Sequence, residues 1–341
     1  MPNAPKTVTL VEVAKRAGVH VSTASRALSS SASGISASTV HRIRGLAEEM
    51  GYEPDPAAAA LRTGRSGVLG VLVPLLSDYV LARIYEGVDA TALASGYNTF
   101  VSNTKDNPVL RKERLNELLA RRVEGIVLGD ARLDGDEVVE ILKRKRVPYV
   151  LVNRRLRGHP SVTTDDVQGG RLAAAHLLEL GHDNIGIVAG PSYASTCVER
   201  THGFVSQYLA AGLSIPDHQI LESGADAVAG YRAGSTLLER SPNITAIFAI
   251  NDSAAIGVMG AIREHGRTPG RDVAVVGYND IPLATYLPVP LTTVRSSMFE
   301  MGREGMSMLL NLIEGKPAPP KLLPPVLMAR ASSGSNATGG R

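Results

Sequence analysis

Six consecutive residues, Val21 to Arg26, have side chains suited to contact with a nucleic acid. They read Val-Ser-Thr-Ala-Ser-Arg, so three short hydroxyl side chains and one arginine occur together. Hydroxyl groups bind phosphate oxygens or base edges, and a guanidinium can form two parallel hydrogen bonds with guanine. An apolar side chain such as Val21 can contact the methyl group of thymine. These residues therefore support recognition through noncovalent contacts.

Two short helices are predicted to hold this segment in place. Thr9-Leu10-Val11-Glu12 fits a capping box, so the first helix should begin at Leu10. Gly18 should end it in the left-handed conformation that glycine adopts at little cost. A turn of three residues follows, and the second helix is expected over residues 21–28. This is the helix-turn-helix pattern, in which the start of the second helix reaches base edges.

A third helix should complete this small domain. Ser36 can cap it and Gly51 can end it. Its apolar residues recur at intervals of three and four positions: Val40, Ile43, Ala47 and Met50. The helix pattern alone is also compatible with a three-helix bundle that does not bind nucleic acid.

The distribution of charge favours the nucleic-acid interpretation. Residues 1–65 contain eight Lys and Arg against five Asp and Glu, a net charge of +3. The whole chain also carries +3, with 36 Lys and Arg against 33 Asp and Glu, so the remaining residues are neutral overall. A segment that meets phosphates is expected to hold such an excess of positive charge.

Three motifs of the N-terminal segment resemble the lactose-repressor (LacI/GalR) family of bacterial transcription regulators. They are the run from Thr9 to Val19, the Ser-Arg pair at 25 and 26, and Gly-Tyr-Glu-Pro at 51–54. The resemblance extends to about residue 330. It implies a head that binds double-stranded operator DNA as a two-fold homodimer on a pseudo-palindromic site, followed by a core that binds a small-molecule effector.

The resemblance places Val21 and Ser22 at the family's main specificity positions, while Arg26 can take guanine. His20 stands where Ser is usual, and a merely solvated histidine is an equal alternative to a phosphate contact. The implied DNA-binding residues are Thr9, His20, Val21, Ser22, Thr23, Ser25, Arg26 and Leu61.

A short hinge helix is expected after the head. Asp55 can cap it, Pro56 suits its first turn, and Ala57–Ala60 favour helix, but about seven residues are too few for a stable isolated helix. By resemblance, two such helices lie in the minor groove and each inserts a leucine, here Leu61, between base pairs. An ordinary interdomain linker is the alternative.

From residue 67 onward, short apolar runs alternate with helix patterns, which predicts an α/β architecture. The expected buried strands are residues 67–74, 98–102, 125–128, 149–152, 185–189, 246–250 and 273–277. The pattern also repeats after 116 residues, because Gly70, Gly87 and Gly96 recur as Gly186, Gly203 and Gly212. Two similar parallel-sheet subdomains are therefore predicted, with a ligand cleft at the carboxyl ends of their strands. The family's periplasmic-binding-protein-like core has this form.

The expected domains are a helix-turn-helix domain over 1–52, a hinge helix and linker over 53–66, a two-subdomain effector-binding and dimerisation core over 67–330, and a disordered tail over 331–341. A helix is predicted from Met298 to Glu314. No leucine heptad follows it, so the sequence gives no support for a C-terminal tetramerisation segment.

The resemblance implies the effector-binding residues Asp78, Val80, Asn153, Arg200, Asn251 and Asn279. A structural ion pair is the alternative role for Arg200. Positions 153 and 279 are often Asp in sugar-binding members, so Asn at both sites predicts a more electropositive pocket beside Arg200. A sugar acid or sugar phosphate is the expected effector, with a neutral sugar as the alternative.

Several classes of function find no motif in the sequence. There is no Walker loop, G-x-S-x-G, H-E-x-x-H or Cys/His cluster, so no enzyme, cofactor or metal site is predicted. The chain has one cysteine, no apolar signal segment at its start and no run of about 18 apolar residues. A cytoplasmic protein without a membrane span is expected. A cytoplasmic solute-binding protein without specific DNA binding is the alternative function.

Overall fold

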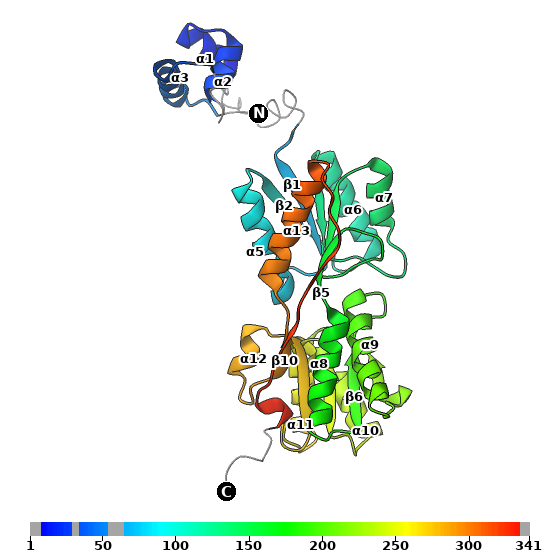
Figure 1. The fold of residues 1–341 in the computed structure, drawn as a ribbon. Helices are drawn as coiled ribbons and strands as arrows, with labels where there is room; N and C mark the ends of the chain where they lie inside the picture. The colour runs from blue at the N-terminus through cyan, green and yellow to red at the C-terminus, as the bar shows by residue number, and fades with distance from the viewer. Residues whose placement is uncertain (1–7, 29–33, 54–64, 335–341) are drawn as a thin grey trace, which may run out of the picture. The chain divides into compact units, whose positions relative to one another are not determined.

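A computed structural model describes residues 8–28, 34–53 and 65–334 of the 341-residue chain (Figure 1). The chain divides into two compact units, Met1–Ser66 and Gly67–Arg341. The predicted hinge residues Asp55, Pro56, Ala57–Ala60 and Leu61 lie outside the described residues.

The N-terminal unit contains three helices, α1 (Leu10–Ala17), α2 (Val21–Leu28) and α3 (Ala37–Glu49). The predicted capping box is confirmed, because the Thr9 amide donates to Glu12 Oε2 at 2.8 Å and the Glu12 amide donates to Thr9 Oγ1 at 3.3 Å. Gly18 ends α1 with φ of 64°, as expected. The buried residues of this unit are mostly small: Val13, Ala14, Ala17, Ala24, Ala27, Ile43 and Ala47.

The C-terminal unit is built on two six-stranded sheets. The first has the order β11-β5-β4-β3-β1-β2 and is parallel throughout. Its strands are β1 (Val68–Val73), β2 (Asn98–Asn103), β3 (Ile126–Leu128), β4 (Tyr149–Val152), β5 (Ser161–Thr164) and β11 (Lys321–Leu323). The second has the order β12-β10-β9-β8-β6-β7, and only β10 and β12 pair antiparallel. Its strands are β6 (Ile185–Ala189), β7 (Ile220–Glu222), β8 (Ala246–Ala249), β9 (Ala274–Asn279), β10 (Thr292–Arg295) and β12 (Val326–Met328).

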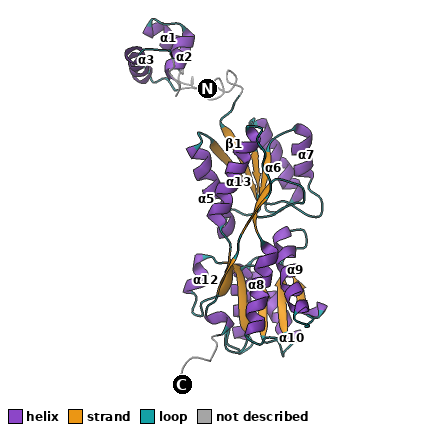
Figure 2. Cartoon of the chain, in the orientation of Figure 1, coloured by secondary structure: helices purple, strands orange, loops and turns teal. Residues whose placement is uncertain are grey.

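Helices cover both faces of each sheet (Figure 2). The helices on the first sheet are α5 (Tyr79–Ala94), α6 (Pro108–Ala120), α7 (Glu137–Lys145) and α13 (Met298–Ile313). Those on the second are α8 (Asp166–Glu179), α9 (Ser195–Ala210), α10 (Ala227–Arg240), α11 (Asp252–Glu264) and α12 (Pro282–Tyr286). Two 3-10 helices, η1 (Asp217–Gln219) and η2 (Ala331–Ser333), complete the elements. The chain passes between the two subdomains after β5, after β10 and after β11.

The predicted internal repeat is confirmed by equivalent packing in the two subdomains. Gly87 on α5 and Gly203 on α9 occupy matching places where another helix approaches closely. A Cβ atom at Gly87 would lie 2.1 Å from the carbonyl oxygen of Phe299, and one at Gly203 would lie 2.0 Å from that of Val167. Only glycine allows these contacts, so the repeated glycines mark equivalent helix pairs, α5 with α13 and α9 with α8.

All seven predicted strands are present, with ends that differ by a few residues at most. The sequence did not predict β5, β7, β10, β11 and β12, which are only three or four residues long. The helix predicted from Met298 corresponds to α13. Among the residues described, no helix combines the length and apolar character that a bilayer span requires.

The predicted disordered tail does not begin at Ala331. Residues 331–333 form η2, and the side chains of Ser332 and Ser333 are buried. Ser332 Oγ donates to the Val275 carbonyl at 2.6 Å and accepts from the Thr292 amide at 2.8 Å. Hydroxyl groups are compatible with burial when they are hydrogen-bonded in this way, which a composition argument cannot anticipate.

Candidate functional site

The surface of α2 presents most of the residues predicted to contact DNA. Ser22 and Arg26 are exposed, while Val21, Thr23 and Ser25 are half-buried. Ala24 and Ala27 face the core of the head, and their small side chains let α2 pack closely against α1 and α3. The polar residues of α2 therefore lie on the side of the helix that faces away from the core of the head.

His20 has a structural role that the sequence did not predict. It immediately precedes α2, where Ser, Thr, Asp or Asn usually caps a helix, and its Nδ1 lies 3.3 Å from the Ser22 amide. The same ring nitrogen is 2.8 Å from Ser22 Oγ. His20 therefore orients the hydroxyl of Ser22, and either a solvated or a DNA-contacting role remains compatible with its exposed ring.

Two arginines of the head support the fold through the ends of other helices. Arg42 donates to the Ala17 carbonyl at 2.7 Å, and Arg44 donates to the Ala27 carbonyl at 3.1 Å. Both carbonyls lie at helix C-termini, where positive charge is favourable. Arg26 differs, because its Nε lies 3.4 Å from the Ser22 carbonyl within α2 itself and its side chain is exposed.

The predicted effector residues lie where parallel strands end. Asp78 follows β1 and caps α5 by accepting from the Val80 amide at 2.8 Å. Asn251 follows β8 and caps α11, and its Nδ2 also donates to the Ala225 carbonyl at 2.7 Å. Asn153 follows β4, and Asn279 is the last residue of β9. These positions belong to both subdomains, as a ligand cleft at the carboxyl ends of the strands requires.

The two asparagines predicted to bind the effector, Asn153 and Asn279, have positive φ angles. φ is 65° at Asn153 and 106° at Asn279. Asparagine tolerates this region better than most other residues, so these positions select a short polar side chain for backbone reasons as well as for hydrogen bonding. Ser296 Oγ donates to Asn279 Oδ1 at 3.3 Å, and the Asn153 amide lies 3.2 Å from the sulfur of Met301. Val80 is buried in the core of the first subdomain.

Arg200 is almost fully buried and has partners on three sides. Its Nε donates to Asp166 Oδ1 at 2.8 Å, and its Nη1 donates to the Ile250 carbonyl at 2.8 Å. Its guanidinium lies 3.7 Å from the centre of the Tyr278 ring. Burial raises the pKa of Asp166, whereas the nearby charge of Arg200 lowers it. The charged form of Asp166 is therefore stabilised by its pairing with Arg200.

The pairing of Arg200 with Asp166 adds an acid that the prediction of a more electropositive pocket did not include. That prediction counted the missing acids at 153 and 279 and omitted Asp166, which supplies a negative charge directly beside Arg200. The sequence did contain a signal for this acid. Asp165 and Asp166 directly follow the run Ser-Val-Thr-Thr at 161–164, and an acid that follows a strand lies at the edge of the sheet where a ligand is expected. Arg200 therefore has the ion pair that was the alternative reading, and a ligand contact through its remaining donors is compatible with that pair.

A second cluster, missed by sequence reasoning, joins the two subdomains. Tyr193, from the loop after β6, donates its hydroxyl to Asp106 Oδ2 at 3.0 Å, and its ring lies 3.7 Å from the Arg132 guanidinium. Arg154 holds both oxygens of Asp106, at 2.8 and 2.7 Å. Burial alone would raise the pKa of Asp106, but Arg154 lowers it below the ordinary value.

This cluster lies close to the predicted effector residues. Burial raises the pKa of Asp78, and Arg200 and Arg154 both act against that rise, so the two arginines lie near one acid. Every one of these charges has a nearby opposite charge. The charged side chains around the predicted effector residues are therefore largely offset by opposite charges.

Asp252 is a further buried carboxyl beside this site. Its oxygens accept from Thr293 Oγ1 at 2.5 Å and from the Ile281 amide at 2.8 Å. Burial raises its pKa to about 7, against the effect of the Thr293 hydrogen bond. Because Asp252 adjoins Asn251 and holds the segment after Asn279, it positions two of the predicted effector residues. In the described part of the chain, no group of three His, Cys, Asp or Glu side chains is arranged for a metal ion.

Comparison with known families agrees with this arrangement over nearly the whole chain. A family model for bacterial regulatory proteins of the lacI family matches residues 9–55, and one for periplasmic binding proteins and the sugar binding domain of the LacI family matches residues 66–328. The chain belongs to the LacI family. Its helix-turn-helix head, its two-sheet core and the resemblance found in the sequence are thereby confirmed.

Among its LacI-family relatives are repressors named HTH-type transcriptional repressor PurR. The one from Photobacterium profundum is 26% identical over 313 residues, which cover 90% of this chain and 92% of the relative. The one from Haemophilus influenzae strain PittEE is 28% identical over 309 residues, with the same coverage. These relatives are regulators, which agrees with the lack of catalytic motifs in the sequence.

Solved LacI-family structures are also similar. The lac repressor dimer bound to operator and the anti-inducer ONPF has a TM-score of 0.88 and 27% identity, covering 97% of this chain and 100% of that one. The complex of the transcriptional regulator CelR with cellobiose has a TM-score of 0.74 and 30% identity, covering 95% and 99%.

Proposed function

We propose that this LacI-family protein is a cytoplasmic, ligand-responsive transcriptional repressor that binds a pseudo-palindromic operator as a homodimer. The observation that carries the proposal is the exposed face of α2, with Ser22 and Arg26, in the same chain as a two-sheet ligand-binding core. The solved lac repressor dimer with its operator supports the assembly by analogy. One head covers half a site, so a two-fold dimer suits a palindrome.

Operator contact is assigned to the residues around α2 and to the hinge. Val21, Ser22 and Arg26 would meet base edges, while Thr9, His20, Thr23 and Ser25 would meet phosphates. Leu61 would insert between base pairs of the minor groove. This division of roles explains why the side chains on α2 are short apart from Arg26: short side chains let the helix approach the groove.

The effector is a small polar metabolite bound by Asp78, Asn153, Arg200, Asn251 and Asn279. The balanced charge of the cleft favours a neutral sugar over a sugar acid or sugar phosphate, because Arg200 already has Asp166 beside it. CelR, whose complex with cellobiose is similar to this chain, offers a precedent for such a ligand. Effector binding alters DNA affinity only through unequal affinity for two arrangements of the subdomains.

The experiment is selection of bound fragments from the organism's own DNA, followed by gel-shift titration of the selected site and of random DNA. The expected result is a palindromic site bound far more tightly than random DNA. Leu61→Ala should weaken binding to the selected site more than to random DNA. Equal losses on both DNAs would remove the wedge role of Leu61, and failure to enrich any site would overturn the repressor assignment.

The effector class is tested by thermal shift with neutral sugars, sugar acids and sugar phosphates. If a neutral sugar stabilises the wild-type protein but not Asn279→Ala, the result supports a neutral sugar as the effector. Stabilisation by acids or phosphates alone would contradict it.

A further inference from the structure

A cavity of ≈ 500 Å³ opens beside the loop that joins β4 to β5. Its apolar wall consists of Leu133, Leu156 and Pro320. Leu133 is 46% exposed, so part of its apolar surface is accessible from the cavity. None of the predicted effector residues lines this cavity, so it is separate from the cleft site.

The polar wall of the cavity comes from both subdomains. Arg155, Arg157 and His159 belong to the loop after β4, while Glu199 belongs to α9 on the second sheet. Arg155 Nε contacts both oxygens of Glu199, at 2.8 and 3.1 Å. The Arg155 amide also donates to Ser195 Oγ at 2.8 Å, so this loop is attached to α9. The cavity therefore lies beside a junction between the subdomains.

The donors of this wall exceed its acceptors. Both contacts of Arg155 with Glu199 use Nε, so among the described residues its two terminal nitrogens have no hydrogen-bonding partner. The exposed guanidinium of Arg157 likewise has neither an ion pair nor a hydrogen bond within the described ranges. Glu199 is the one acid among the lining residues, and Asp166 and Asp165 act on Arg155 from outside the lining.

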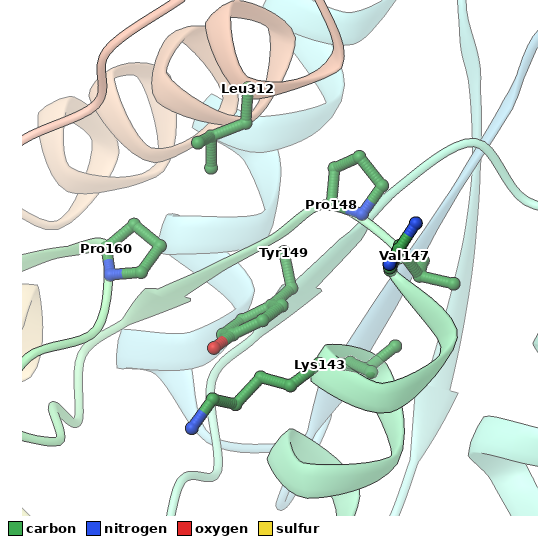
Figure 3. A pocket seen from close by; sticks show the side chains of 8 residues that line it. Lys143, Val147, Pro148, Tyr149, Pro160 and Leu312 are labelled. Atoms are coloured by element: carbon green, nitrogen blue, oxygen red, sulfur yellow. The ribbon is translucent and has the colours of Figure 1, made fainter. Parts of the chain in front are cut away.

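His159 adds an imidazole to the same wall. Burial and the charge of Lys143 lower the pKa of His159, which favours its neutral form. Its Nδ1 lies 2.7 Å from the Tyr149 hydroxyl, which leaves Nε2 for a ligand. Tyr149 and Lys143 line a neighbouring cavity of ≈ 260 Å³ (Figure 3). That cavity is lined by Arg146 and by Lys143, which pairs with Glu140 at 3.3 Å.

We propose that the cavity beside the β4–β5 loop binds a small organic anion, either a carboxylate or a phosphate monoester. The oxyanion would be held by the terminal nitrogens of Arg155 and by Arg157, whose fork-shaped guanidinium groups match carboxylate and phosphate geometry. The carbon part of the ligand would lie against Leu133, Leu156 and Pro320. This site is distinct from the cleft and goes beyond the proposed function.

This site adjoins a contact between the subdomains. An anion on the terminal nitrogens of Arg155 would share the guanidinium whose Nε binds Glu199, and Glu199 is carried by the other subdomain. The ligand is therefore a candidate second effector, acting on the same subdomain arrangement as the cleft ligand through different residues.

The test is isothermal titration calorimetry of the full chain with inorganic phosphate and with benzoate, at low ionic strength. Wild-type protein should bind at least one of the two anions. Arg157→Gln should weaken that binding by about tenfold, because it removes a charge-assisted contact. The matched control is Arg144→Gln, an exposed arginine of α7 that lines neither cavity, and it should leave binding unchanged.

The two anions distinguish the two ligand chemistries. Binding of benzoate alone assigns the site to carboxylates, and binding of phosphate alone assigns it to phosphate monoesters. The proposal is overturned if neither anion binds, if Arg157→Gln binds as well as wild type, or if Arg144→Gln loses as much affinity as Arg157→Gln. Gel-shift titration of Arg157→Gln on the selected operator tests the two proposals separately. Without ligand, this variant should bind the operator as tightly as wild type does.

Discussion

The polar residues of the α2 surface and those of the cleft differ in where their partners come from. On α2, His20 contacts Ser22 two residues away, and Arg26 contacts the Ser22 carbonyl four residues away. In the cleft, Arg200 binds Asp166 and the Ile250 carbonyl, which are 34 and 50 residues away. Ser22 and Arg26 on α2 are exposed, whereas Arg200 is 5% exposed.

This difference determines what each region contributes to stability. Exposed polar groups exchange water for a partner at small cost, so they can be reserved for DNA. Buried charges must be paired within the protein, because an unpaired ion in the interior is very unfavourable. Substitutions on α2 should therefore change binding, and substitutions in the cleft should change folding as well.

The largest effect is expected from Arg200→Met. Removing the guanidinium leaves Asp166 buried without its cation, which should lower the free energy of unfolding of the core by about 3–5 kcal/mol. Urea denaturation monitored by circular dichroism measures this loss. The double variant Arg200→Met with Asp166→Leu should recover much of it, since it removes both charges. An Arg200→Met core as stable as wild type would break the contrast with α2.

A pH-dependent loss of stability is expected from Asp252. Its folded pKa of about 7 lies above the ordinary 3.8, so the folded state holds the proton more tightly than the unfolded state. The resulting stabilisation is complete below pH 4 and is lost as pH rises to about 7, at most about 4 kcal/mol. Urea titrations at several pH values should show a steeper fall between pH 4 and 7 in wild type than in Asp252→Asn. Parallel profiles would contradict the assignment.

On the head, Arg26→Ala should separate binding from folding. Specific operator affinity should fall by about 1–3 kcal/mol, while stability changes by less than about 0.5 kcal/mol. Arg44→Ala is the matched arginine variant, and it should instead destabilise the head because it removes the contact with the Ala27 carbonyl. Gel shift and thermal melting of both variants sharpen the comparison. It fails if Arg26→Ala melts as early as Arg44→Ala does.

The smallest effect is expected from Tyr193→Phe. This change deletes the hydrogen bond to Asp106 but keeps the ring on Arg132, so about 1 kcal/mol of stability should be lost. Hydrogen exchange of the Leu133 amide, which donates to the Tyr193 carbonyl at 2.9 Å, reports whether the subdomain contact loosens. Tyr193→Ala should increase that exchange much more than Tyr193→Phe. Unchanged exchange in both variants would show that the contact does not couple the subdomains.

Local patterns were sufficient for the head and for the main strands of the core. The capping box at Thr9, the stop at Gly18 and the run of apolar residues in β1 each depend on side chains within a few positions, so they are readable without a fold. The repeat of Gly87 and Gly203 was also visible, although the sequence did not say which backbones approach them. The hinge with Leu61 lies outside the described residues, and its role stays a proposal.

The sequence by itself determined the family, the two-part organisation and the strand ends that carry Asn153, Asn251 and Asn279. Only the tertiary structure showed that Asp166 is the partner of Arg200. Asp166 lies 34 residues from Arg200 in the chain, and the two meet because α8 and α9 pack together. Pairing between buried charges depends on which elements come into contact, and no local pattern contains that information. For the same reason, the basic cavity formed by Arg155 and Arg157 with α9 could not be found before the subdomains were seen together.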